Sequence, residues 1–120
     1  MYKSCDVIKK LDKPVLTYKD TPYNSALIFN ASVEKYNGKY VMIFRNDYGD
    51  FENQKLEGTN IGFATSDNGI DWTVSDKTFF SKHDGDITRV YDPRITIIDG
   101  QCYVCFAVDT KHGVRGGITK

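Results

Sequence analysis

The 120-residue sequence has no net charge, because its 16 Lys and Arg residues are matched by 16 Asp and Glu residues. A dedicated binder of nucleic acid or of an anionic membrane normally carries a basic surplus, so we expect neither partner. Long apolar runs are also missing from the N-terminal stretch MYKSCDVIKKLDKP. We therefore expect neither a signal peptide nor a membrane span at this end.

Cysteine is scarce and odd in number. Cys5, Cys102 and Cys105, together with the missing signal peptide, predict reduced thiols and a cytoplasmic protein. Cys102 and Cys105 have C-x-x-C spacing, but they lie in CYVCFAV, a sequence typical of a strand. Residues three apart on a strand point to opposite faces, and no second Cys or His pair has zinc-ligand spacing. We therefore expect no metal site.

Strand-forming sequence, in contrast, is abundant. The eight Tyr residues favour β-structure, although aromatic rings that stack on sugars are an alternative explanation. The dipeptides Asn37-Gly38 and Asp99-Gly100 each separate two strand-like runs, which is a strong signal of a tight hairpin. Residues 40–44 and 103–108 are continuous apolar runs, which predict strands covered on both faces.

The two hairpins form a repeat with an offset of 62 residues, obtained by setting Gly38 on Gly100. A third strand follows each hairpin, at residues 61–65 and 116–119, and the first copy continues into a short fourth strand at residues 71–74. The register aligns Asn30 with Asp92, Val33 with Ile95, Tyr36 with Ile98 and Phe44 with Phe106. Four-stranded antiparallel meanders in series are typical of β-propeller blades.

We therefore predict an all-β fold with about two propeller blades. Residues 1–29 form an N-terminal extension, residues 30–80 the first blade and residues 90–120 an incomplete second blade. The alternative is a sandwich that contains two unrelated hairpins. A propeller has at least four blades, so we expect the chain to be part of a longer protein. Two blades alone would leave apolar surface bare, which favours self-association, with a homo-oligomer as one outcome.

Asn30 and Asp92 are the polar residues that this repeat places at equivalent positions, where each begins an inner strand. Ligands of propellers gather beside these strands, so the pair predicts a shared site, unless both are simply turn residues. Pro93 should hold Asp92 extended. Arg94 should then share a face with Asp92 and orient it, ionise it or bind an anion, unless it forms a salt bridge between blades. We interpret Asp47, Asp50 and Glu52 as a solvated acidic loop, since they lack calcium-loop spacing.

Several of these stretches together resemble glycoside hydrolase family 130. They are Phe29-Asn30-Ala31-Ser32-Val33, residues 40–45, Ile61-Gly62-Phe63-Ala64-Thr65-Ser66 and Tyr91-Asp92-Pro93-Arg94-Ile95. The family consists mainly of β-mannoside phosphorylases on a five-bladed propeller. The resemblance runs from about Asn30 to the C-terminus and corresponds to the N-terminal third of a member. Tyr91 before the D-P-R triplet and the stretch 45–50 look more like the mannosylglucose phosphorylase branch.

The resemblance implies inverting phosphorolysis of a β-mannoside to mannose 1-phosphate. Asp92 matches the family's general acid, and Asn30 and Arg45 match positions that contact the mannosyl unit. Inorganic phosphate is the co-substrate, no cofactor is implied, and Arg115 is the best local candidate for binding the phosphate. With most phosphate ligands on later blades, this chain alone should be inactive. Two alternatives stay open: a five-bladed-propeller hydrolase, which needs further carboxylates, and a propeller that binds carbohydrate without catalysis.

Overall fold

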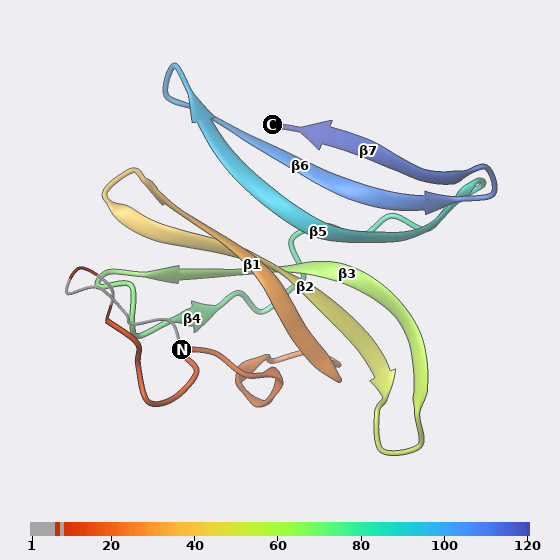
Figure 1. Cartoon of the computed structure of the whole chain (residues 1–120), viewed down its shortest axis with the longest axis horizontal. Helices are drawn as coiled ribbons and strands as arrows, with labels where there is room; N and C mark the ends of the chain where they lie inside the picture. Colours follow the sequence, from red (N-terminus) through yellow and green to blue (C-terminus); the bar gives the residue numbers. More distant parts are fainter. Residues whose placement is uncertain (1–6, 8) are drawn as a thin grey trace.

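The computed structural model describes residue 7 and residues 9–120, and it folds them into two antiparallel sheets (Figure 1). A single 3-10 turn, η1 (Tyr18–Asp20), precedes the strands among the described residues. The first sheet has the order β1 (Leu27–Tyr36), β2 (Lys39–Asp50), β3 (Lys55–Ser66), β4 (Thr73–Val74). The second has the order β5 (Ile87–Ile98), β6 (Gln101–Thr110), β7 (Gly113–Thr119). The all-β prediction is confirmed.

Both predicted hairpins are confirmed, and they share one geometry. Tyr36 pairs with Lys39 around the first turn, and Ile98 pairs with Gln101 around the second. Asn37 and Asp99 both have φ of 50°, and the glycine that follows each also has a positive φ. Positive φ at both central residues defines the turn whose twist matches antiparallel strands, and Asn-Gly and Asp-Gly adopt it most readily.

A β-bulge occurs at the same place in both copies of the repeat. Asn30 and Ala31 together lie opposite Phe44, and Asp92 and Pro93 together lie opposite Phe106. The first bulge residue has φ of 51° at Asn30 and 52° at Asp92. Asn and Asp tolerate this left-handed conformation better than most side chains do. The expectation that Pro93 holds Asp92 extended is therefore wrong, because the bulge decides the backbone there.

A phenylalanine covers a glycine on the neighbouring strand in each sheet. Gly62 pairs with Phe44, and Gly117 pairs with Phe106. A Cβ atom added to either glycine would overlap the phenylalanine ring beside it. The two sheets therefore share their bulge, their turn and this aromatic contact, which supports the repeat register that was read from the sequence.

The two sheets pack against each other through β5, which contacts β1, β2 and β3 (Figure 1). The apolar core between them contains Ile43, Ile61, Val90, Val104 and Val108. Thr59 joins the sheets inside this core, since its hydroxyl donates to the Val90 carbonyl at 2.7 Å and accepts from the Val90 amide at 3.2 Å. These two hydrogen bonds link β3 of the first sheet to β5 of the second.

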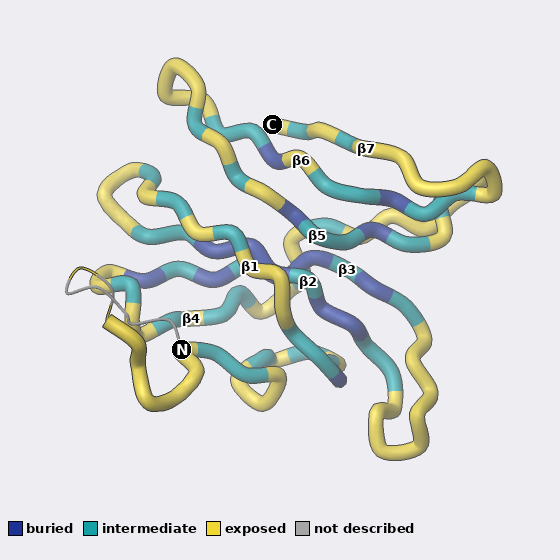
Figure 2. The backbone as a smooth tube through the Cα atoms, viewed as in Figure 1, coloured by how far each residue is buried: buried dark blue, intermediate teal, exposed yellow. Residues whose placement is uncertain are grey.

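The far face of the first sheet carries its own apolar cluster. Met42, Phe44 and Ala64 are buried there, with Leu16, Ile28, Trp72 and Val74 packed around them. Residues 42–44 are buried one after another, so β2 is covered on both faces as predicted. In β6, Val104 is buried but Cys105 is exposed, so the same prediction is wrong for residues 103–108. The buried residues of β6 are four apart and therefore lie on one face, and most of β6 and β7 is half-buried or exposed (Figure 2).

The turn between β3 and β4 is held by the side chain of Asn68. Its Oδ1 accepts hydrogen bonds from the backbone amides of Ile70 and Asp71 at 2.9 and 2.8 Å. Trp72 follows and donates from Nε1 to the Gly69 carbonyl at 3.2 Å. The described part of the chain contains no helix with the length and apolar character needed to cross a bilayer.

Candidate functional site at the junction of the two sheets

The two bulges place Asn30 and Asp92 in direct contact across the junction of the sheets. Asn30 Nδ2 donates to Asp92 Oδ1 at 2.7 Å, although the residues are 62 apart in sequence. The side chain of Asp92 is 37% exposed, so solvent and ligands can reach it. Its Oδ2 has no protein hydrogen-bond partner among the described residues. The contact between these two equivalent positions therefore leaves the Asp92 carboxyl with Oδ1 hydrogen-bonded to Asn30 and Oδ2 available to a ligand.

Arg45 approaches the same carboxyl from β2. Its Nη1 lies 3.7 Å from Asp92 Oδ1, and its side chain is only 15% exposed. Burial disfavours the charged guanidinium, but hydrogen bonds and charge interactions with Asp47 and then Asp92 outweigh that effect. The pKa of Arg45 is therefore held above its usual value, and the group stays cationic. Three of the predicted site residues, Asn30, Arg45 and Asp92, thus form one cluster.

Asp47 is a member of this cluster that the sequence analysis missed. Its two carboxylate oxygens accept from Arg45 Nε at 2.7 Å and from Arg45 Nη2 at 3.0 Å. It lies within β2, and its side chain is 5% exposed. The interpretation of Asp47 as part of a solvated acidic loop is therefore wrong, because β2 continues to Asp50 and carries Asp47 inward. The signal was available, since residues 45 and 47 alternate onto one face of a strand.

Two aromatic rings at equivalent repeat positions flank Arg45. Its guanidinium carbon lies 4.6 Å from the ring centre of Phe29 and 5.1 Å from that of Tyr91. The Tyr91 hydroxyl donates to Asp109 Oδ1 at 2.6 Å, and this hydrogen bond, with burial, raises the pKa of the phenol. Tyr91 therefore presents a neutral ring to the cation, a contact that stabilises a guanidinium in a partly dry environment.

Arg94 lies beside the cluster without contacting the Asp92 carboxylate. Its Nη1 donates to the Pro93 carbonyl at 2.6 Å and to the Asn30 carbonyl at 3.2 Å. The expectation that Arg94 orients or ionises Asp92 assumed a regular strand, and the bulge removes that regularity. The cation nearest to Asp92 is Arg45 instead. Arg94 is exposed, which leaves its remaining donors free for an anion.

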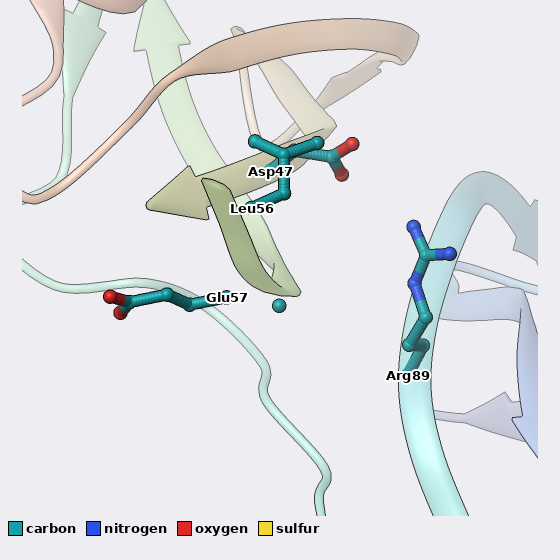
Figure 3. Close-up of a pocket in the computed structure, with 5 residues that line it drawn as sticks. Asp47, Leu56, Glu57 and Arg89 are labelled. Carbon is teal, nitrogen blue, oxygen red and sulfur yellow. The ribbon is translucent and has the colours of Figure 1, made fainter. Parts of the chain in front are cut away.

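An open groove of about 400 Å³ brings Asp92 together with Arg115, the predicted phosphate residue. Cys105, Phe106 and Ala107 of β6 form its floor, and β7 supplies Val114, Arg115 and two glycines. Arg115 is exposed and donates from Nη1 to the Val114 carbonyl at 2.8 Å. A smaller hollow of about 220 Å³ is lined by Asp47 from the first sheet and by Arg89 from the second (Figure 3).

Metal ligands do not gather in the described part of the chain. No group of three or more His, Cys, Asp or Glu residues is placed to hold an ion there. Cys102 is partly buried and Cys105 exposed, and both are free thiols, whereas Cys5 lies outside the described residues. The chemistry that this geometry can perform is proton transfer from a carboxyl and the binding of hydroxyls or anions by guanidinium and amide groups.

Comparison with known proteins points to one family. Residues 3–120 match the model of glycoside hydrolase family 130, described as β-1,4-mannooligosaccharide phosphorylase. A curated relative, the 1,2-β-oligomannan phosphorylase of Thermoanaerobacter sp. (strain X514), is 32% identical over 103 residues, which are 82% of this chain and 35% of the relative. The chain therefore spans about a third of the length of the curated relative that it matches.

Two crystal structures share the fold. One is a candidate glycoside hydrolase from Parabacteroides distasonis ATCC 8503, with a TM-score of 0.63 and 22% identity over 76% of this chain and 28% of that chain. The other is a candidate glycoside hydrolase from Bacteroides ovatus ATCC 8483, with a TM-score of 0.62 and 20% identity over 76% of this chain and 27% of that one. At this level of identity the likeness concerns the fold, and it shows that the two sheets correspond to part of a larger architecture.

Proposed function

This chain belongs to glycoside hydrolase family 130, the family of the β-1,4-mannooligosaccharide phosphorylase model, and on that premise we propose that it contributes the acid-bearing part of an inverting β-mannoside phosphorylase. Because the chain spans about a third of its curated relative, the active unit is a longer protein that contains it. The two sheets are consecutive blades of a five-bladed propeller in this proposal. The observation that carries it is the contact among Asn30, Arg45 and Asp92.

Phosphorolysis needs one proton donor, because inorganic phosphate is already an anionic nucleophile. Phosphate attacks the anomeric carbon of the mannosyl unit, the glycosidic C–O bond breaks, and its electron pair and one proton go to the leaving sugar. Asp92 supplies that proton through Oδ2, the oxygen left free by Asn30 and Arg45. Arg45 and Asn30 also bind the mannosyl unit, and Arg94 and Arg115 attract phosphate from the exposed side.

A hydrolase would need a second carboxylate that activates water. Asp47 is the carboxylate joined to the cluster through Arg45, but it is 5% exposed and both its oxygens accept from that guanidinium. A general base must be free to accept a proton from water, and Asp47 is not. This engagement of Asp47 favours phosphorolysis over hydrolysis for the cluster as it stands.

The substrate is a β-linked mannoside, and we propose β-1,4-mannosyl-glucose as the first to test. The relative's name concerns 1,2-β-oligomannan, so β-1,2-mannobiose and β-1,4-mannobiose belong in the same panel. Cys102 and Cys105 are free thiols, and we propose a cytoplasmic location for the longer protein. Small sugars and phosphate are the expected partners.

The test measures mannose 1-phosphate released by the longer protein with and without phosphate. Asp92→Asn is the informative variant, because Asn also tolerates the left-handed backbone at this bulge and changes little except the acid. We expect phosphate-dependent turnover that this variant lowers by at least about 100-fold. Free mannose formed equally fast without phosphate would favour a hydrolase. If the wild-type protein and Asp92→Asn bind the sugar equally well and neither turns it over, a propeller that only binds carbohydrate is favoured.

A further inference from the structure

Arg45 and Asp47 form an ion pair of unusual geometry for two residues on one strand. The Asp47 carboxylate engages Nε and Nη2 of the guanidinium at 2.7 and 3.0 Å, which is a bidentate contact. Both side chains are largely removed from solvent, at 15% and 5% exposure. A buried ion pair contributes little net stability, since desolvation of both charges opposes their attraction. Its bidentate form instead restricts the direction in which the guanidinium points.

Hydrogen bonds from Asn46 anchor the part of β2 that carries this ion pair. Asn46, which lies between the two residues, is 0% exposed. Its Nδ2 donates to Asn60 Oδ1 at 2.8 Å and to the Asn24 carbonyl at 3.2 Å. The backbone that carries Arg45 and Asp47 is therefore anchored from β3 on one side and from the segment before β1 on the other.

The ion pair leaves the Nη1 nitrogen of Arg45 without a contact to Asp47. Nε and Nη2 are occupied by Asp47, and Nη1 is the nitrogen that faces Asp92 Oδ1 at 3.7 Å. The rings of Phe29 and Tyr91 contact the guanidinium. An arginine without the Asp47 contact could rotate about its last side-chain bonds and present a different edge, because arginine has several flexible torsions and five donors.

We propose that Asp47 is a positioning residue, which orients Arg45 so that Nη1 is presented to Asp92 and to the mannosyl unit bound beside it. This inference rests on the proposed function for its kinetic consequence, but the orientation itself does not depend on turnover. Asp47 does not touch the substrate in this arrangement. Its effect on the reaction passes through Arg45.

A first experiment needs no substrate. Nitrogen-15 NMR of the labelled longer protein that contains this chain reports the Arg45 Nε–H group, whose exchange with water is slow when it donates to a buried carboxylate. We expect Asp47→Asn to speed this exchange by at least about tenfold. Asp67→Asn is the matched control, because Asp67 is an exposed carboxylate that pairs with Lys39 on the surface. An Arg45 signal that is unaltered in Asp47→Asn would overturn the orientation claim, whether or not the protein is a phosphorylase.

The kinetic experiment uses the longer protein that contains this chain. We expect Asp47→Asn to lower kcat/KM by about 10-fold to 100-fold, as loss of a residue that orients a ligand-binding group typically does. Arg45→Met should lower it at least as much, and Arg45→Met/Asp47→Asn should match Arg45→Met. Losses that multiply in the double variant would show that Asp47 acts independently of Arg45 and would overturn the proposal.

A folding defect in Asp47→Asn does not remove this test. Asp47→Asn leaves a buried cation without its partner and Arg45→Met leaves a buried anion, whereas Arg45→Met/Asp47→Asn leaves neither charge. Each kcat/KM is therefore divided by the folded fraction of that variant, measured by urea unfolding, before Arg45→Met is compared with the double variant. If no variant and no wild-type protein releases mannose 1-phosphate, the proposed function fails, and the NMR result still decides the orientation of Arg45.

Discussion

The two sheets repeat one backbone design but differ in burial and in chemistry. Both have the positive-φ hairpin, the bulge and the phenylalanine over glycine. The central strand of the first sheet is buried on both faces, while β7 of the second sheet is exposed along most of its length (Figure 2). The repeated sequence therefore determines the backbone geometry of each sheet, whereas the segments packed against a sheet determine how far its residues are buried.

The chemical difference lies at equivalent positions of β2 and β6. The first copy has Arg45 and Asp47, and the second has Ala107 and Asp109. Asp47 binds the guanidinium of its own strand, whereas Asp109 accepts from the Tyr91 hydroxyl. The arginine of the first sheet reaches the acid of the second, so the site exists only where unequal copies meet.

The largest difference between the two sheets should appear when the phenylalanine that covers a glycine in each sheet is replaced by alanine. Phe44 is 1% exposed, whereas Phe106 is only partly buried at the edge of the core. We expect Phe44→Ala to lower the free energy of unfolding by about 3–5 kcal/mol. Phe106→Ala should cost about half as much. Urea denaturation followed by Trp72 fluorescence measures both, and equal losses would contradict the difference in burial.

The two bulges should respond alike, since their backbone is the same. Asn30 and Asp92 have φ of 51° and 52°, which a β-branched residue adopts at a cost of about 1–2 kcal/mol. We expect Asn30→Val and Asp92→Val to be less stable than the matching glycine variants by about 1 kcal/mol each. The same denaturation assay compares them. A penalty at only one position would show that the bulges are not equivalent.

Tyr23, in the segment between η1 and β1, has a buried hydroxyl that finds no hydrogen-bond partner among the described residues. Burial raises its pKa to about 12. Tyr23→Phe should therefore stabilise the chain by up to about 1 kcal/mol at neutral pH, because an unpaired buried hydroxyl is removed. A destabilised variant would instead indicate that the hydroxyl forms a favourable interaction.

The pH dependence of this tyrosine has a definite sign. The folded state keeps the phenol protonated above the ordinary pKa of 10.0, so the unfolded state loses its proton first. Tyr23 therefore causes no pH-dependent loss of stability below pH 10, and the free energy of unfolding falls as the pH rises from 10 toward 12. Tyr23→Phe should flatten the fall in the midpoint of urea unfolding over this interval. An equal fall in both proteins would assign it to other groups.

The smallest effect should come from the exposed ion pair of Lys39 and Asp67, which are 3.5 Å apart. Asp67→Asn should change the free energy of unfolding by less than about 0.5 kcal/mol, because solvent screens such pairs. Thermal melts in low and high salt measure this change. A salt-sensitive loss above 1 kcal/mol would show that surface charge matters more to the first sheet than burial indicates.

Local chemistry made part of the site predictable. The Asn-Gly and Asp-Gly turns and the 62-residue offset placed Asn30 and Asp92 at equivalent positions, because turn preference and strand alternation act over a few residues. The bulges could not be predicted, because an extra residue in one strand can be recognised only when its pairing with the neighbouring strand is known. The burial of Asp47 escaped prediction for a related reason, because the extension of β2 to Asp50 depends on its pairing with β3.

The sequence by itself determined the all-β character, the two hairpins and the register of the repeat, because hydrogen-bonded turns and alternation are encoded locally. Only the tertiary structure decided that Asn30 donates to Asp92, that Arg45 rather than Arg94 approaches this acid, and that Asp47 is buried. These contacts depend on how two twisted sheets pack through β5. That packing results from side-chain fit across the junction, which no stretch of sequence specifies alone.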